Sequence, residues 1–254
     1  MKIGVTDEGE ISREISKVMK EENFVLVPTP ASVIKERPDI IVHTAEIPFW
    51  ESNLDPPRAW STNTWMAINI ARAGSKVGAV NVYPSTFMVY NGRKGFYLEH
   101  NTPNPLNYYG ISKLAAETGI ASLGNYLIMR VGALYSLSYD GVLKPFIKAS
   151  FLGKRIKCSQ DIYLSPISVY TFSSTLAKLI KKGIKGFVNV SGPRVSLYDF
   201  CVKITDLFGN DAESIKTPYL DLSLDDWLLR ALGIKIDGRE DFLKLLERKA
   251  IGET

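Results

Sequence analysis

The chain has 254 residues, of which 45% are hydrophobic and 23% charged, a composition typical of a globular protein with a substantial core. Its net charge of +4, from 31 basic and 27 acidic residues, is too small and too dispersed to favour nucleic-acid binding. No apolar run is long enough to span a membrane, and the N-terminus has no signal-peptide pattern. We therefore expect a soluble, cytoplasmic protein that binds neither nucleic acid nor membrane.

Short apolar runs alternate with amphipathic patterns along the first half of the chain. Apolar runs bounded by turn residues predict strands at residues 2–5, 24–28, 39–45, 77–85 and 126–132. Helical spacing of apolar residues predicts helices at residues 10–22, 58–74 and 109–122, the second of them with Gly74 as its C-cap. Strands rich in Val and Ile, each followed by a helix, indicate an α/β fold with a Rossmann-like, doubly wound parallel sheet.

The pattern loosens after Gly132. In this half we expect helices at 143–153 and 196–209, a loop at 163–168, a strand near 186–192 and a C-terminal helix that begins at Asp225–Trp227. We therefore divide the chain into a dinucleotide-binding, Rossmann-like core at residues 1–135 and a C-terminal segment at residues 136–254. The segment is expected to be partly core and partly a small substrate-binding lobe over the carboxyl edge of the sheet.

The chain has two cysteines, Cys158 and Cys201. They are far apart in the sequence and lack the spacing of metal ligands. We expect both to be buried free thiols in a protein of a reducing compartment.

The segment NPLNYYGISKLAAE, residues 104–117, places Tyr109 and Lys113 one helical turn apart on one face. Tyr108 diverges from Lys113 by roughly 140°, so Tyr109 is the paired phenol. A nearby ammonium lowers the pKa of a phenol from its usual value of ~10, which suits a proton donor. Most Tyr and Lys pairs with this spacing lie on the protein surface and have no function. This one gains weight because it follows a strand that ends in Ser85 and Thr86, within a βαβ pattern.

Residues 83–117, YPSTFMVYNGRKGFYLEHNTPNPLNYYGISKLAAE, resemble the active-site segment of extended short-chain dehydrogenases/reductases. Within them the sequence is most similar to the dTDP-4-dehydrorhamnose reductases, which also have counterparts of RPDIIVHTA at residues 37–45 and of LSPISVYTFSSTLAKLI at residues 164–180. The resemblance covers most of the chain up to about Phe208. It implies reduction of the 4-keto group of a nucleotide-linked deoxysugar, with NADPH or NADH as cofactor.

The resemblance also implies roles for individual residues. Thr86 would hydrogen-bond the substrate carbonyl, Tyr109 would donate the proton, and Lys113 would bind the nicotinamide ribose and lower the pKa of the phenol. These three are the expected catalytic residues. The expected cofactor contacts are Thr6, Gly9, Ile11, Ala45, Asn63, Ser85, Tyr109 and Lys113.

The sequence departs from the family most in its cofactor loop. The family has Gly-x-x-Gly-x-x-Gly after the first strand, whereas this chain has TDEGEIS at residues 6–12, in which only Gly9 aligns. Asp7, Glu8 and Glu10 place three carboxylates where a pyrophosphate is expected, although acids also suit the first turn of a helix. The segment at residues 24–39 is shortened, and neither an Arg nor an Asp follows its strand to hold the adenosine ribose.

A second hypothesis follows from these departures. The chain could be a non-catalytic relative that binds a partner, as does the regulatory subunit of methionine adenosyltransferase, which resembles the same family. The substituted residues Phe87 and Ala133, where the family has an acid and often a tryptophan, alter the sugar side as well.

The remaining candidates favour structural roles. His43 and His100 are the only histidines and have too few partners for a metal site, so we expect no metal. Trp50, Trp60 and Trp65 are more typical of a core or a subunit contact than of a ligand site. Because extended members of this fold often pair through helices of the sheet, a homodimer is expected.

Overall fold

The computed structural model describes residues 1–238 and 241, which form two compact units. The first unit contains residues 1–89, 103–131 and 173–188. The second contains residues 90–102, 132–172 and the described residues from 189 on. Within the described residues, no helix combines the length and the apolar composition needed to cross a membrane.

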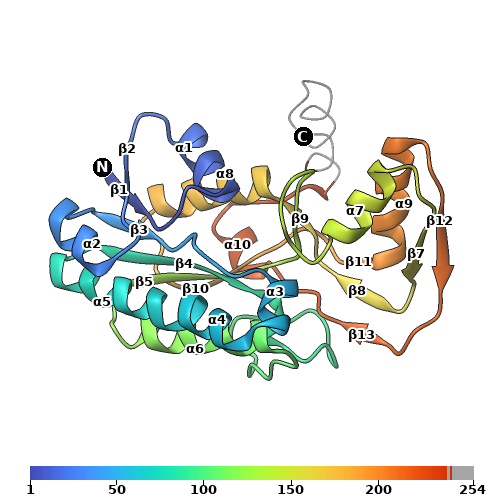
Figure 1. Cartoon of the computed structure of the whole chain (residues 1–254), viewed down its shortest axis with the longest axis horizontal. Helices are drawn as coiled ribbons and strands as arrows, with labels where there is room; N and C mark the ends of the chain where they lie inside the picture. Colours follow the sequence, from blue (N-terminus) through green and yellow to red (C-terminus); the bar gives the residue numbers. More distant parts are fainter. Residues whose placement is uncertain (239–240, 242–254) are drawn as a thin grey trace. The chain divides into compact units, whose positions relative to one another are not determined.

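A six-stranded sheet, in the order β10-β5-β4-β3-β1-β2, forms the centre of the first unit (Figure 1). Neighbours among β1 to β5 pair in parallel, with Gly4 opposite both Val25 and Ile41. From β1 the chain first adds β2 on one side and then β3, β4 and β5 on the other, so the strand order reverses between β1 and β3. This makes the sheet doubly wound and confirms the predicted fold. The strands are β1 (Lys2–Val5), β2 (Asn23–Leu26), β3 (Ile40–Val42), β4 (Val80–Thr86), β5 (Tyr126–Val131) and β10 (Gly186–Val190).

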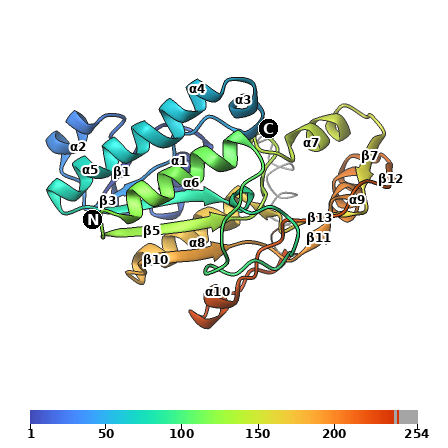
Figure 2. The same cartoon turned by 90° about the horizontal axis from the view of Figure 1, so that it is seen from below.

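Helices cover both faces of this sheet. Helices α5 (Ala67–Val77) and α6 (Tyr108–Ala121) lie on one face, and α1 (Glu10–Val18) and α8 (Val169–Lys181) lie on the other (Figures 1 and 2). The short α2 (Pro30–Glu36), which the sequence analysis did not predict, packs against α5. The buried core between the sheet and α5 and α6 includes Ala67, Ala71, Tyr83, Ala116, Ile120 and Ile128.

The predicted helix at residues 58–74 is broken into three segments and ends later. The segments are α4 (Pro56–Ala59), the π-helical segment η1 (Trp60–Met66) and α5. The C-cap is Gly78, at φ 83°, so the assignment of Gly74 as C-cap is wrong. Gly74 lies inside α5. A glycine suits this position because a Cβ there would lie 2.7 Å from Ile41 Cδ1. A glycine needed for close helix–sheet packing therefore resembled a helix stop.

Helix α6 begins at the carboxyl end of β4. The Asn107 side chain caps it by accepting a hydrogen bond from Gly110 N at 2.8 Å. A Cβ on Gly110 would clash with the carbonyl oxygen of Met88, in the short helix η2 (Phe87–Val89) that follows β4. Gly110 therefore lets the first turn of α6 approach the end of β4, and Tyr109 is in that turn.

The described part of the second unit contains small sheets and short helices. Strand β8 (Ile162–Leu164) pairs with β11 (Val195–Ser196) and β13 (Leu220–Asp221), and β6 (Leu134–Tyr135) pairs with β9 (Ile167–Ser168). The predicted loop at residues 163–168 thus holds parts of two short strands. The helices are α7 (Lys144–Phe151), α9 (Leu197–Phe208) and α10 (Trp227–Ala231), the last beginning where the sequence predicted.

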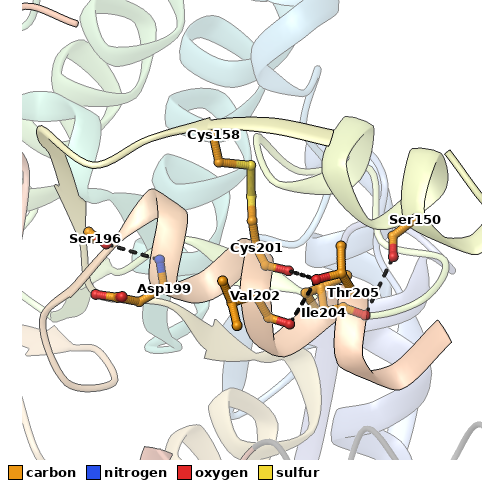
Figure 3. The surroundings of a disulfide bond; sticks show 8 residues. All are labelled: Ser150, Cys158, Ser196, Asp199, Cys201, Val202, Ile204 and Thr205. Carbon is orange, nitrogen blue, oxygen red and sulfur yellow. Dashed lines mark hydrogen bonds between the residues drawn. A yellow bond between two sulfur atoms is a disulfide. The ribbon is translucent and has the colours of Figure 1, made fainter. Parts of the chain in front are cut away.

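Cys158 and Cys201 form a disulfide, so the prediction of free thiols is wrong (Figure 3). Cys158 is in β7 (Ile156–Ser159), which pairs with β12 (Ala212–Ile215), and Cys201 is in α9. Helix α9 is held on β7 so that the two Cα atoms are 6.5 Å apart, although the residues are 43 positions apart in the sequence. The pairing also removes the argument for a reducing compartment, because disulfides persist mainly in oxidising ones.

Candidate active site

Tyr109 and Lys113 meet at a single oxygen atom. The Tyr109 hydroxyl donates to Glu46 Oε2 at 3.2 Å, and Lys113 Nζ donates to the same atom at 3.0 Å. The side chain of Tyr109 is buried, with 9% of its surface exposed, whereas the neighbouring Tyr108 is 55% exposed. The geometry thus places Tyr109 beside Lys113, as helical spacing predicted, and Tyr108 at the surface.

Lys113 is a buried cation, with 2% of its side chain exposed. Burial alone would lower its pKa, but Tyr83, Glu46 and Tyr109 together raise the pKa of Lys113 above its ordinary value. Its Nζ atom lies 4.4 Å from the centre of the Tyr83 ring. Burial raises the pKa of Tyr83 to about 12, so this phenol stays neutral at physiological pH. Lys113 is therefore a permanent positive charge beside Tyr109.

Glu46 is the site residue that the sequence analysis missed. It follows Ala45 in the loop beyond the carboxyl end of β3, and its side chain is 19% exposed. An acid in the loop after the carboxyl end of a buried parallel strand was the available signal, because ligands bind at that edge. Its partners are 63 and 67 residues away, a pairing that sequence spacing does not give.

Ser85 and Thr86 end β4, which is next to β3 in the sheet. Thr86 Oγ1 accepts a hydrogen bond from Met88 N at 3.2 Å, so its own proton remains available to donate. Ser85 Oγ is buried and has no hydrogen-bond partner among residues 1–238 and 241. Two hydroxyl groups thus lie at the strand edge that also carries Glu46, one of them with its hydrogen-bonding capacity unused.

The first loop lies at the same edge, because β1 is the other neighbour of β3. Thr6 Oγ1 accepts from Ala45 N at 2.8 Å, and Gly9 is the N-cap of α1. Asp7 Oδ1 accepts from Ser12 Oγ at 2.9 Å, so this carboxylate is held against the first turn of the helix. The expected contact Ile11 is buried on the inner face of α1. The structure therefore brings Thr6, Gly9 and Ala45 to one edge together with a fixed carboxylate.

Asn63, another expected cofactor contact, is buried in η1 and bonded to protein groups. Its Oδ1 accepts from Ile47 N at 2.7 Å, and its Nδ2 donates to Ile47 O at 3.1 Å and to Ser112 Oγ at 3.2 Å. In this arrangement Asn63 holds the loop that follows β3. A contact between Asn63 and a cofactor stays a prediction.

The remaining candidates lie apart from this pair or in structural roles. His43 is buried and its Nε2 contacts Asn81 Oδ1 at 3.0 Å; burial lowers its pKa to about 4, so it is neutral. Within the described residues, no group of three or more His, Cys, Asp and Glu could hold a metal ion. Trp50, Trp60 and Trp65 are exposed, which excludes a place in the core, and the alternative of a subunit contact stays a prediction.

The chain is similar to known proteins in sequence and in structure. The family model RmlD substrate binding domain matches residues 8–219. Methionine adenosyltransferase 2 subunit beta of Rattus norvegicus is 29% identical over 190 residues, which are 68% of this chain and 55% of that protein. The chain thus spans little more than half the length of this curated relative.

Two solved structures are similar over nearly the whole chain. A hypothetical dTDP-4-dehydrorhamnose reductase from Sulfolobus tokodaii has a TM-score of 0.80 and 27% identity, covering 91% of this chain and 94% of that one. The dTDP-4-dehydrorhamnose reductase of Bacillus anthracis, in complex with NADP, has a TM-score of 0.83 and 25% identity, covering 100% and 98%. These matches confirm the resemblance to extended short-chain dehydrogenases/reductases. The chain belongs to the RmlD substrate binding domain family.

Proposed function

We propose that this protein reduces the 4-keto group of a nucleotide-linked deoxysugar, with NADPH or NADH as the hydride donor. The observation that carries the proposal is the convergence of the Tyr109 phenol and the Lys113 ammonium on one point. Reduction of a carbonyl leaves an oxyanion that must be protonated, so a proton donor beside a buried cation is what the protein has to supply.

Each of the three expected catalytic residues has a defined task in this reaction. The cofactor, when bound, supplies the hydride. Thr86 donates its free hydroxyl proton to the carbonyl oxygen and so orients it, and Tyr109 delivers its own proton to the same oxygen. Lys113 stays charged because its pKa is raised, and it stabilises the phenolate that Tyr109 leaves behind.

The residues of the site fit a dinucleotide at one end better than at the other. The buried, unpaired hydroxyl of Ser85 and the donors of Tyr109 and Lys113 suit the nicotinamide nucleoside. The start of α1 offers backbone N–H groups to a pyrophosphate, but Asp7 is fixed at the same helix start. We therefore propose that the dinucleotide binds weakly.

A second candidate function is a partner-binding subunit without catalysis. Two observations favour it: the Asp7 carboxylate at the start of α1, and the Glu46 carboxylate on the catalytic pair. A reduction assay separates the candidates. Turnover of a dTDP-linked 4-keto-6-deoxysugar, with matching loss of NADPH absorbance, supports the reductase. Binding of neither NADPH nor NADH would leave the partner-binding function.

Lys113→Met is expected to move the basic limb of the pH–rate profile to higher pH and to lower the rate. Reduction needs the protonated phenol, and the variant lacks the cation that favours the phenolate, so Tyr109 loses its proton later and donates it less readily. The control is the double variant Lys113→Met with Glu46→Gln. It removes the Glu46 carboxylate, which would otherwise lack its Lys113 partner beside the phenol. An unshifted basic limb in both active variants would show that Lys113 does not tune the phenol.

Asp7→Asn is expected to tighten the binding of NADPH and of its fragment 2′,5′-ADP alike. A carboxylate about 5 Å from a phosphate, at an effective dielectric constant near 20, costs about 3 kcal/mol before salt screening. For the same reason, the affinity of the unmodified protein should improve or fall little as salt rises. Fluorescence titration of NADPH at several salt concentrations checks both results. Binding tighter than about 1 µM at low salt would contradict the repulsion.

Three further features belong to this proposal. We place the substrate-binding lobe within residues 136–254 and the dinucleotide-binding core within residues 1–135. We also assign the protein to the cytoplasm, because its nucleotide-sugar substrate is expected there; the disulfide does not support this assignment. A homodimer is included because Trp50 and Trp65 are exposed in the first unit.

A further inference from the structure

The Glu46 carboxylate occupies both donors on which the proposed chemistry depends. Its Oε2 atom accepts from Tyr109 and from Lys113, the two groups assigned to the nicotinamide ribose and the substrate. We infer that Glu46 is a positioning residue that sets the affinity of the site for the nicotinamide ribose. To bind Lys113, the ribose hydroxyls must displace the Glu46 carboxylate from it. The inference rests on the proposed function.

The backbone on both sides of Glu46 is pinned, so its placement is built into the fold. Ala45 N donates to Thr6 Oγ1 at 2.8 Å, which ties the loop to the end of β1. Ile47 N donates to Asn63 Oδ1 at 2.7 Å, and Ile47 O accepts from Asn63 Nδ2 and from Ser52 Oγ. The backbone of Glu46 therefore has a fixed place, from which its side chain reaches Tyr109 and Lys113.

The electrostatics of the pair make the displacement unfavourable. Of the groups that raise the pKa of Lys113, Tyr83 and Tyr109 are phenols and Glu46 is the carboxylate. A ribose diol can accept from Lys113 and Tyr109 as the carboxylate does, but it carries no charge. The exchange replaces an ion pair between the buried cation and a carboxylate with a hydrogen bond from that cation to a neutral hydroxyl, and binding of the nicotinamide nucleoside becomes weaker by the difference.

The test compares two ligands on two proteins. Glu46→Gln keeps the shape of the side chain and a carbonyl acceptor but removes the charge. It is expected to tighten NADPH binding about tenfold, the equivalent of about 1.4 kcal/mol. Binding of 2′,5′-ADP, which lacks the nicotinamide ribose, is expected to stay unchanged. Calorimetric titration measures both affinities in the absence of a sugar substrate, so turnover does not enter.

Matched variants separate this effect from general electrostatics and from misfolding. Glu51→Gln removes an exposed carboxylate from α3 (Phe49–Leu54), where it pairs with Arg58, and should change neither affinity. In a Lys113→Met background the gain from Glu46→Gln should disappear, because no cation remains for the carboxylate to occupy. Thermal unfolding verifies that each variant is folded.

The outcomes distinguish the inference from the proposed function. Unchanged NADPH affinity in Glu46→Gln, or an equal gain for NADPH and 2′,5′-ADP, would overturn the inference and leave the reductase proposal standing. A selective gain for NADPH without any sugar reduction would support the inference and count against the reductase. If neither NADPH nor NADH binds either protein, both are overturned.

Discussion

Tyr109→Phe is expected to lower the rate of carbonyl reduction by about 10²–10⁴-fold, the usual contribution of a general acid. The phenol is the proton donor next to the buried Lys113 ammonium, and a phenyl ring of the same shape cannot replace that proton. The fold should survive, because Glu46 keeps its hydrogen bond to Lys113. Steady-state reduction of the 4-keto substrate by NADPH measures the effect, and the affinity for NADPH is determined beside it.

Tyr108→Phe is the matched control for this substitution. Tyr108 is the neighbouring residue, it is 55% exposed, and it does not share the face of Lys113. The control should keep the full rate. Equal losses in the two variants, or an unchanged rate in Tyr109→Phe, would show that the proton comes from another group.

The helix spacing and the strand pattern were enough to predict the architecture and the pairing of Tyr109 with Lys113. Both depend on local periodicity: alternating apolar runs place the parallel strands, and a separation of four residues places two side chains on one helix face. The segment that follows β4 combines these local signals. Its residues therefore lie where the sequence predicted them.

Glu46 could not be predicted in the same way. Its position depends on the sheet order, which puts β3 between β1 and β4, and on anchors from Thr6 and Asn63 in distant parts of the chain. The π-helical turn around Asn63 is likewise invisible to a 3.6-residue period. Because the site combines residues at the ends of β1, β3 and β4, its residues can be assigned only once the tertiary structure is known.

The disulfide was missed for a related reason. Cys158 and Cys201 are separated by 43 positions, and connectivity over such a distance depends on the packing of α9 against β7. The lack of metal-ligand spacing argues against a metal site, but it does not imply free thiols. In Figure 3 the bond joins β7 to a helix that is capped at Ser196 and hydrogen-bonded internally through Thr205.

Removing the disulfide is expected to lower the free energy of unfolding by about 4 kcal/mol, because the unfolded chain regains the entropy of a loop of this length. The variant is Cys158→Ser combined with Cys201→Ser, which leaves no unpaired thiol, and denaturant unfolding measures the change. Thr205→Val is the matched control on the same helix. It removes only the hydrogen bonds to Cys201 O and Val202 O, and should lower the free energy of unfolding by about 1 kcal/mol.

A thiol titration decides whether the bond is the source of that stability. Both cysteines are buried, so the protein is unfolded in denaturant without reductant before the thiol reagent is added. No reactive thiol is expected before reduction, and two are expected after it. The reduced protein should also have the same free energy of unfolding as the double variant. Two reactive thiols before reduction would mean that the protein holds its cysteines reduced. A loss of stability in the double variant would then come from the two buried side chains and not from a cross-link between α9 and β7.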